Sequence, residues 1–278
     1  METMNEFWSM NEGSFCCLND YKRTMAFKKA IENTIKKGDV VVEMGSGSGV
    51  LSMFAIDAGA SKVYTVELDK VNVQSLRKTF SANGYTGKIK IIEGDATSIN
   101  LPEEVDVIIC EMIATGLIEE LQVPAMNNAL RYAKKGTRVL LEKYSIDLDL
   151  VSSKNTFYKK TFETIRFELP EMRKMKSAAL SETLTLRIVD FTQINKKTII
   201  KEKIDVKITQ SGTINGIRLK GRTIFADGSF FNSSTSYSFP MILPVAPIEV
   251  KKGETLNVSI SYDMCKGPSK LKYSLLKL

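Results

Sequence analysis

The chain has 278 residues, of which 43% are hydrophobic and 26% charged, a composition typical of one large globular domain or two small ones. Its start lacks the basic and apolar regions of a signal peptide, and no apolar run approaches the roughly 18 residues that a membrane helix needs. The four cysteines fit neither a disulfide framework nor a zinc spacing, and there is no histidine, which excludes serine–histidine catalysis and most zinc chemistry. We therefore expect a cytoplasmic protein with no membrane segment and no bound metal.

The net charge of +7 is unevenly distributed along the chain. Residues 1–143 hold 17 basic and 19 acidic side chains, whereas residues 144–278 hold 22 basic and 13 acidic ones. A basic C-terminal half could bind nucleic acid. The simpler interpretation is a solvated, charged surface.

Residues 1–19 show no clear period and predict a loosely structured arm that covers a site. Residues 20–35 follow with a helical pattern, for which Asp20 is suited as N-cap and Met25 lies on the apolar stripe. Strand and helix patterns then alternate. Strands are predicted at 40–44, 62–67, 89–93, 105–110 and 138–142, and helices at 50–58, 70–83 (with Val71 facing inward) and 119–133. This alternation predicts a doubly wound, Rossmann-like parallel sheet, with ligands bound beyond the carboxyl ends of its strands.

After Lys143 the pattern changes to short strands without helices between them. They are predicted at 145–151, 184–189, 198–208, 217–225, 236–243 and 256–262. Such spacing favours an antiparallel β-sandwich or β-barrel, of which we expect the barrel. We predict two domains, 1–144 for the parallel sheet and 145–278 for the barrel.

A glycine turn, Gly45-Ser46-Gly47-Ser48-Gly49, connects the first strand to the next helix. Glycines let backbone N–H groups approach a ligand closely, and the helix N-terminus favours an anion. A dinucleotide site would need glycine at the sixth position, where this chain has Val50. Glu67 ends the next strand, 22 residues after Gly45, and is placed to bind ribose hydroxyls. Together these features favour S-adenosylmethionine over a dinucleotide, with a turn that binds no ligand as the remaining alternative.

Two further features follow strand ends. Asp95 and Ala96 come after the third strand, where a carboxylate and a backbone N–H can bind adenine; the alternative is that Asp95 only caps a turn. Glu111 and Glu120 lie on the loop after the most apolar strand. Two carboxylates on one loop repel unless a cation lies between them, and a guanidinium suits that role. The alternative is that the acids at 119 and 120 only favour a helix N-terminus.

With these motifs, residues 20–148 resemble the protein arginine methyltransferase family of class I S-adenosylmethionine-dependent enzymes. The resemblance implies S-adenosyl-L-methionine as cofactor and methyl transfer to an arginine of a protein substrate. It implies that Arg23 holds the cofactor carboxylate and that Glu111 and Glu120, nine residues apart, are the paired glutamates that bind the guanidinium. The cofactor site would then comprise Arg23, Glu43, Gly45, Gly47, Glu67, Asp95 and Ala96.

The sequence also departs from this family. The family's threonine–histidine–tryptophan loop falls on Thr235-Ser236-Tyr237, and Phe7 and Trp8 stand in the arm where the family has tyrosines. A glutamate that contacts adenine falls on Thr97, and the dimerisation arm is shortened. These departures leave the oligomeric state and the acceptor open. RNA or another protein side chain, a non-catalytic binding module and a dinucleotide oxidoreductase are the alternatives.

Overall fold

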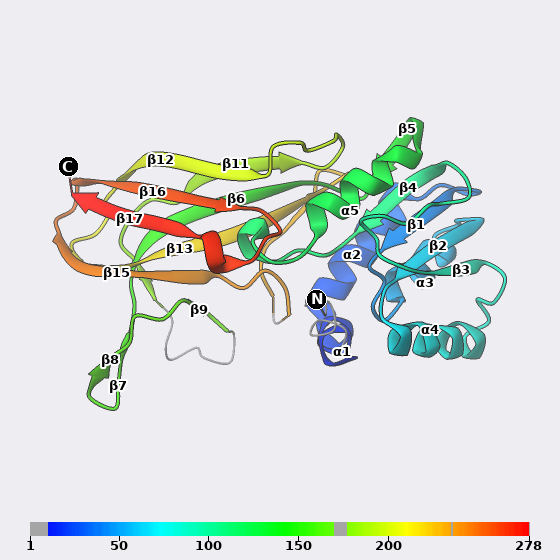
Figure 1. Cartoon of the computed structure of the whole chain (residues 1–278), viewed down its shortest axis with the longest axis horizontal. Helices are drawn as coiled ribbons and strands as arrows, with labels where there is room; N and C mark the ends of the chain where they lie inside the picture. The colour runs from blue at the N-terminus through cyan, green and yellow to red at the C-terminus, as the bar shows by residue number, and fades with distance from the viewer. Residues whose placement is uncertain (1–10, 170–176, 235, 278) are drawn as a thin grey trace.

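The computed structural model describes residues 11–169, 177–234 and 236–277. Its first half is a parallel sheet of five strands in the order β3-β2-β1-β4-β5. Figure 1 shows this sheet at one end of the molecule and the antiparallel strands at the other. The elements of the first half are α1 (Asn11–Asn19), α2 (Tyr21–Thr34), β1 (Val40–Met44), α3 (Val50–Asp57), β2 (Lys62–Glu67), α4 (Lys70–Ala82), β3 (Ile89–Glu93), β4 (Val105–Cys110), η2 (Thr115–Leu117), α5 (Gln122–Ala129), η3 (Leu130–Tyr132) and β5 (Ala133–Val139).

The second half consists of antiparallel strands. One sheet has the order β10-β6-β13-β15-β9, with β11 also paired to β6 and β14 to β13; another has the order β12-β16-β17, and β7 pairs with β8. A bridge between Ser181 and Ile208 joins the two larger sheets. The strands are β6 (Leu141–Ser152), β7 (Thr156–Phe157), β8 (Lys160–Thr161), β9 (Arg166–Phe167), β10 (Ala178–Ala179), β11 (Leu184–Asp190), β12 (Ile199–Lys207), β13 (Gly212–Phe225), β14 (Phe230–Phe231), β15 (Met241–Val250), β16 (Thr255–Asp263) and β17 (Lys272–Lys277); η5 is Pro268–Lys270.

The predicted fold class, a doubly wound parallel sheet followed by antiparallel strands, is confirmed. β1 to β4 have the predicted bounds. The runs of Val and Ile in β1, β2 and β4 are buried on both faces, as inner parallel strands require, whereas β3 lies at the edge of the sheet and is only partly buried. Asp20 caps α2 as predicted, with its carboxylate accepting a hydrogen bond from the Arg23 N–H. The division into 1–144 and 145–278 stays a prediction.

Some predicted bounds and burials were wrong. The strand predicted at 138–142 is two strands, because β5 ends at Val139 and β6 begins at Leu141 in the other sheet. The helix predicted at 119–133 shortens to α5, which begins at Gln122 and so places Pro124 in the first turn, where a missing N–H costs little. Met25 and Val71, predicted to face inward, have 39% and 56% of their surface exposed.

Two other predictions concern the arm and the loop before β15. Residues 11–19 of the predicted loose arm form the helix α1, whereas Phe7 and Trp8 lie outside the described residues. The strand predicted at 236–243 begins only at Met241, and a backbone with φ of 46° at Ser238 precedes it. In the described ranges, no helix is long and apolar enough to cross a membrane.

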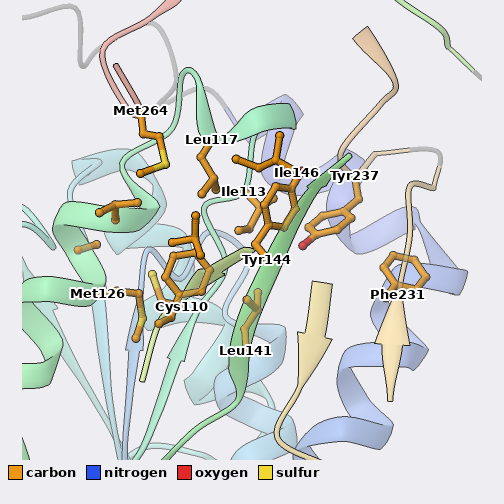
Figure 2. Close-up of a cluster of buried hydrophobic side chains, with 14 of the residues drawn as sticks. Cys110, Ile113, Leu117, Met126, Leu141, Tyr144, Ile146, Phe231, Tyr237 and Met264 are labelled. Carbon is orange, nitrogen blue, oxygen red and sulfur yellow. The ribbon is translucent and has the colours of Figure 1, made fainter. Parts of the chain in front are cut away.

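A continuous hydrophobic core connects the two halves. The ring of Phe27 on α2 meets that of Phe225 on β13 edge to face, with centroids 5.0 Å apart. Figure 2 shows one buried cluster that contains Cys110 at the end of β4, Leu117 of η2 and Tyr144 of β6. The loop after β4 therefore lies where the two halves meet.

Candidate functional site

The glycine turn follows β1 and is held against the end of β2. The N–H groups of Gly45 and Ser46 both donate to the carbonyl of Val66, at 3.1 and 3.0 Å. Gly45, Gly47 and Gly49 all have positive φ, which only glycine adopts readily. A Cβ at Gly47 would lie 3.0 Å from the Ser14 hydroxyl of α1, and one at Gly49 would lie 2.5 Å from Leu76 of α4. The turn is thus closely packed on both sides.

Glu67 lies at the end of β2, directly beside this turn. One carboxylate oxygen accepts from the Gly47 N–H at 2.8 Å, and the other accepts from the Asp69 N–H at 2.9 Å. Burial raises the pKa of Glu67 above its usual range, although these two N–H groups act in the opposite direction. The carboxylate is therefore held by backbone at a fixed orientation, which suits the recognition of two ribose hydroxyls.

Glu43, also predicted to bind cofactor, lies beneath the turn. It is almost fully buried and accepts a hydrogen bond from the Ser52 hydroxyl of α3. Burial raises the pKa of Glu43 to about 8, so its carboxyl group is largely protonated at neutral pH. The Ser52 hydroxyl also lies 2.5 Å from the hydroxyl of Thr65. Glu43 thus links β1 to α3 and β2 under the glycine turn.

Asp95 and Ala96 form a turn beside Glu67. The N–H of Gly94 donates to the Glu67 carbonyl at 2.9 Å, and the Asp95 carboxylate accepts from the Thr97 N–H at 2.8 Å. This second bond is the turn cap that the sequence left as an alternative. The carbonyl of Ala96 accepts from the Asn128 side chain of α5 at 3.0 Å. The glycine turn, Glu67 and the Asp95 turn therefore meet at one edge of the sheet.

Glu111 and Glu120 lie on the loop between β4 and α5. The second half of the chain holds this loop with four hydrogen bonds. Two involve side chains: the Thr115 hydroxyl donates to the Phe239 carbonyl (2.5 Å), and the Tyr262 hydroxyl donates to the Gly116 carbonyl (2.8 Å). Two join backbones: the Cys265 N–H donates to the Leu117 carbonyl (2.7 Å), and the Gly267 N–H donates to the Ile118 carbonyl (2.9 Å). The fully buried Leu117 has a φ of 56°, in the left-handed region that non-glycine residues avoid. Such loops persist only where the surroundings fix them.

Arg23 forms a buried ion pair with Glu111, so the structure brings together a residue predicted to hold cofactor and one predicted to bind acceptor. The guanidinium also lies over the ring of Phe27, at 5.1 Å from its centroid, and near Tyr237 at 6.0 Å. Glu120 has no hydrogen-bond partner among the described residues. Burial and the neighbouring Glu119 raise the pKa of Glu120 to about 7.

Asp20 connects α2 to the loop where the family's histidine and tryptophan would fall. Its second carboxylate oxygen accepts from the N–H of Ser236 at 2.9 Å and from the Ser236 hydroxyl at 3.0 Å. Burial acts to raise the pKa of Asp20, but its hydrogen bonds from Ser234, the Arg23 N–H and Ser236 outweigh this and lower it. The first residue of that loop, Thr235, lies outside the described residues.

Sequence reasoning missed the residues that support the site. Tyr262, Gln122 and Asn128 bind the backbone of its loops. The two amides were visible as polar residues within an otherwise apolar helix pattern, which is a usable signal. Nothing in the local pattern around Tyr262 indicates its contact with Gly116, 146 residues away.

Comparisons with known proteins agree with this arrangement. Residues 22–140 match the family model described as ribosomal protein L11 methyltransferase (PrmA). The protein MJ1452 of Methanocaldococcus jannaschii is 31% identical over 250 residues, which cover 89% of this chain and 90% of that protein. Protein arginine N-methyltransferase 9 of Xenopus laevis is 32% identical over 193 residues, covering 66% of this chain and 22% of that enzyme.

Among solved structures, the PRMT1 enzyme–prozyme complex of Trypanosoma brucei with AdoHcy has a chain that superposes with a TM-score of 0.76 at 17% identity, covering 94% of this chain and 95% of that one. The fold and the glycine turn define a class I methyltransferase, a class that uses S-adenosyl-L-methionine. The chain belongs to the family of MJ1452 and is similar to the protein arginine methyltransferases in part of its sequence and in its fold. It spans between 22% and 51% of the length of the curated arginine methyltransferases that it matches.

Proposed function

We propose that this protein transfers a methyl group from S-adenosyl-L-methionine to a guanidinium nitrogen of an arginine in a protein substrate. The observation that carries the proposal is the Arg23–Glu111 ion pair. It supports the view that the loop after β4 accommodates a guanidinium, with Glu120 as a second acid on the same loop. A planar guanidinium can donate to both acids at once.

The residues at the sheet edge fit the cofactor. Glu67 and the Asp95 turn would hold the adenosine, and Gly45, Gly47 and Arg23 would hold the methionine end. Gly47 fits this role because it has a positive φ and no side chain that would keep a ligand away from the turn. When bound, the cofactor supplies an electrophilic methyl group on a positively charged sulfur.

Glu111 and Glu120 would bind the acceptor guanidinium and direct one nitrogen at that methyl group. The bound cofactor would supply the methyl group and would itself leave as a neutral thioether, so no group of the protein would need to displace it. Methylation of a guanidinium releases one proton, and Glu120, with its pKa raised to about 7, is suited to take it. Alignment and exclusion of water supply the rest of the catalysis.

Labelling in a cell extract tests this function. The protein is incubated with methyl-labelled S-adenosyl-L-methionine and extract, and the products are divided by protease and nuclease treatment. We expect protease-sensitive label that acid hydrolysis converts to methylarginine. Label that only nuclease removes, or no label, would overturn the proposal.

RNA is the second candidate acceptor, because three lysines share one exposed face. Ser261 of β16 is the register partner of both Lys201 on β12 and Lys272 on β17, and Lys203 lies two residues along the same face. These lysines form no ion pair with any carboxylate that the structure describes. RNA binding that weakens steeply with salt, together with nuclease-sensitive label, would favour this candidate.

We also propose that the chain divides functionally into the cofactor domain, 1–144, and the substrate domain, 145–278. Expression of residues 1–144 alone would test the division. We expect residual cofactor binding without methyl transfer from such a fragment.

We further propose a cytoplasmic location. The four cysteines are all unbridged, which supports a reducing compartment such as the cytoplasm.

A further inference from the structure

Helix α5 carries three amide side chains, Gln122, Asn127 and Asn128, within eight residues. Each of them exchanges two hydrogen bonds with the backbone of another segment. Burial of an amide is costly unless it is hydrogen bonded, so these contacts fix the segments to the helix. The helix itself packs against β1 and β4, the central strands of the parallel sheet.

Gln122 closes the base of the loop that carries Glu111 and Glu120. Its side chain is fully buried, donates to the Cys110 carbonyl at 3.0 Å and accepts from the Met112 N–H at 2.8 Å. Glu111 lies between Cys110 and Met112 in the sequence, so the amide binds the backbone on either side of Glu111. Because Glu120 is only two residues before Gln122, the same contact ties the two acids together.

Asn128 performs the equivalent task for the adenosine side. Its amide, 5% exposed, donates to the carbonyls of Ala96 and Ile99, both at 3.0 Å. The guanidinium of Arg131 donates to the Asn128 side-chain carbonyl at 2.9 Å, which turns the NH₂ group toward the Asp95 turn. That turn is thereby closed by the same helix that closes the acceptor loop.

Asn127 provides an internal comparison. It donates to the Asn195 carbonyl at 3.0 Å and accepts from the Asn195 N–H at 2.8 Å. Asn195 lies between β11 and β12, in a segment without any of the proposed site residues. Asn127 therefore makes the same number of backbone hydrogen bonds as Gln122, but away from the site.

We propose that α5 sets the position of the acceptor loop relative to the cofactor site, with Gln122 as the positioning residue for Glu111 and Glu120, and Asn128 as the positioning residue for the Asp95–Ala96 turn. This inference rests on the proposed function. Gln122 acts on the reaction through Glu111, and Asn128 acts on cofactor binding through the turn. Neither side chain takes part in the chemistry itself.

Leucine substitutions at the three amides separate these roles. Since a misplacement of about 1 Å can cost about a hundredfold in rate, Gln122→Leu should lower kcat/KM for the acceptor at least about thirtyfold and change cofactor Kd less than about twofold. Asn128→Leu should weaken cofactor binding about tenfold, and the rate should recover at saturating cofactor. Asn127→Leu should destabilise the protein comparably and leave both constants within about twofold. Equal losses of affinity and rate across all three variants would overturn the inference.

Gln122→Glu supplies a rescue. A protonated carboxyl group can donate to the Cys110 carbonyl and accept from the Met112 N–H as the amide does, and burial at this position favours the protonated form. At pH 6 we expect kcat/KM of Gln122→Glu to exceed that of Gln122→Leu at least about tenfold. This gain is the part of the lost activity that returns when the loop is aligned again. No recovery would overturn the assignment of Gln122.

Hydrogen exchange followed by mass spectrometry tests the same inference without any acceptor. Gln122→Leu should speed exchange in residues 111–118 and leave residues 95–99 protected, and Asn128→Leu should do the reverse. If the wild-type protein methylates nothing, the proposed function fails, while this exchange pattern still decides whether α5 positions the two loops. Uniform deprotection in both variants would overturn the inference.

Discussion

The two halves of the site are built in different ways. The cofactor side is held by neighbours in the parallel sheet, since the Glu67 carboxylate is fixed by N–H groups of Gly47 and Asp69, and the glycine turn by Val66. The loop after β4, which carries Glu111 and Glu120, is held largely by residues of the second half of the chain, such as Phe239 and Tyr262. The glycine turn and Glu67 are therefore positioned by the parallel sheet, whereas the loop after β4 depends on the second half of the chain for its position.

The largest expected effect is on the acceptor side. Glu120→Gln removes one of the two charges that would hold the guanidinium, so methyl transfer should fall about a hundredfold or more, while cofactor affinity stays unchanged. Calorimetry with S-adenosyl-L-methionine and a labelled-methyl assay measure the two effects. Glu119→Gln, on the same loop, is the matched control and should lose much less activity. Full turnover by Glu120→Gln would remove the guanidinium site from consideration.

The next largest effect is a loss of cofactor affinity. Glu67→Ala removes a buried carboxylate that would bind ribose hydroxyls, and should weaken cofactor binding by about 1–3 kcal/mol. Glu93 is the register partner of Glu67 on β3 and is exposed, so Glu93→Ala serves as control. Calorimetric affinity that is the same for both variants would contradict the placement of the cofactor.

A smaller effect should follow from loosening the acceptor loop without touching its acids. Tyr262→Phe leaves the buried Gly116 carbonyl without its hydrogen bond, at a cost of about 1–3 kcal/mol in the free energy of unfolding. We expect severalfold slower methyl transfer and unchanged cofactor affinity. Tyr85→Phe removes a tyrosine hydroxyl that donates a hydrogen bond to Asp57 at the surface. It should change neither the rate of methyl transfer nor the cofactor affinity. If Tyr262→Phe weakened cofactor binding as strongly as transfer, the two halves of the site would not be separable.

The last effect is a pH dependence confined to the acceptor side, which vanishes above pH 7. Burial raises the pKa of Glu120 to about 7, so the carboxylate is protonated below that pH and cannot pair with a guanidinium. Therefore kcat/KM for the acceptor should rise about tenfold per pH unit below pH 7 and level off above it. The residual activity of Glu120→Gln should lack this limb. An identical limb in that variant would assign the titration to another group.

The sequence predicted the positions of the glycine turn and Glu67 better than the surroundings of Glu111 and Glu120. The reason is that the first two are placed by neighbouring strands and the acids by distant contacts. The turn from Gly45 to Gly49 and Glu67 belong to adjacent strands, so periodicity and strand order were sufficient to place them on one edge. The acids on the loop were visible as residue types at a suggestive spacing. Their surroundings were not, because the contacts of Thr115 and Gly116 reach residues more than a hundred positions away.

Local chemistry also explains the errors in the fold. The apolar run around Leu140 gives no sign that one strand ends at Val139 and another begins at Leu141, since both sheets bury residues of the same type. Val71 looked like a core residue because it shares its helix with Val73 and Leu76, yet it points to solvent. The ion pair of Arg23 with Glu111 joins two motifs that sequence reasoning had assigned to different ligands.

The late anchors of the acceptor loop have a consequence for the newly synthesised chain. Tyr262, Cys265 and Gly267 follow the glycine turn and Glu67 in the sequence, so they leave the ribosome later. A nascent protein would thus pass through a stage that binds the nucleoside but cannot yet act on another molecule. Under the proposed function, methyl transfer would begin only after these contacts to the acceptor loop have formed.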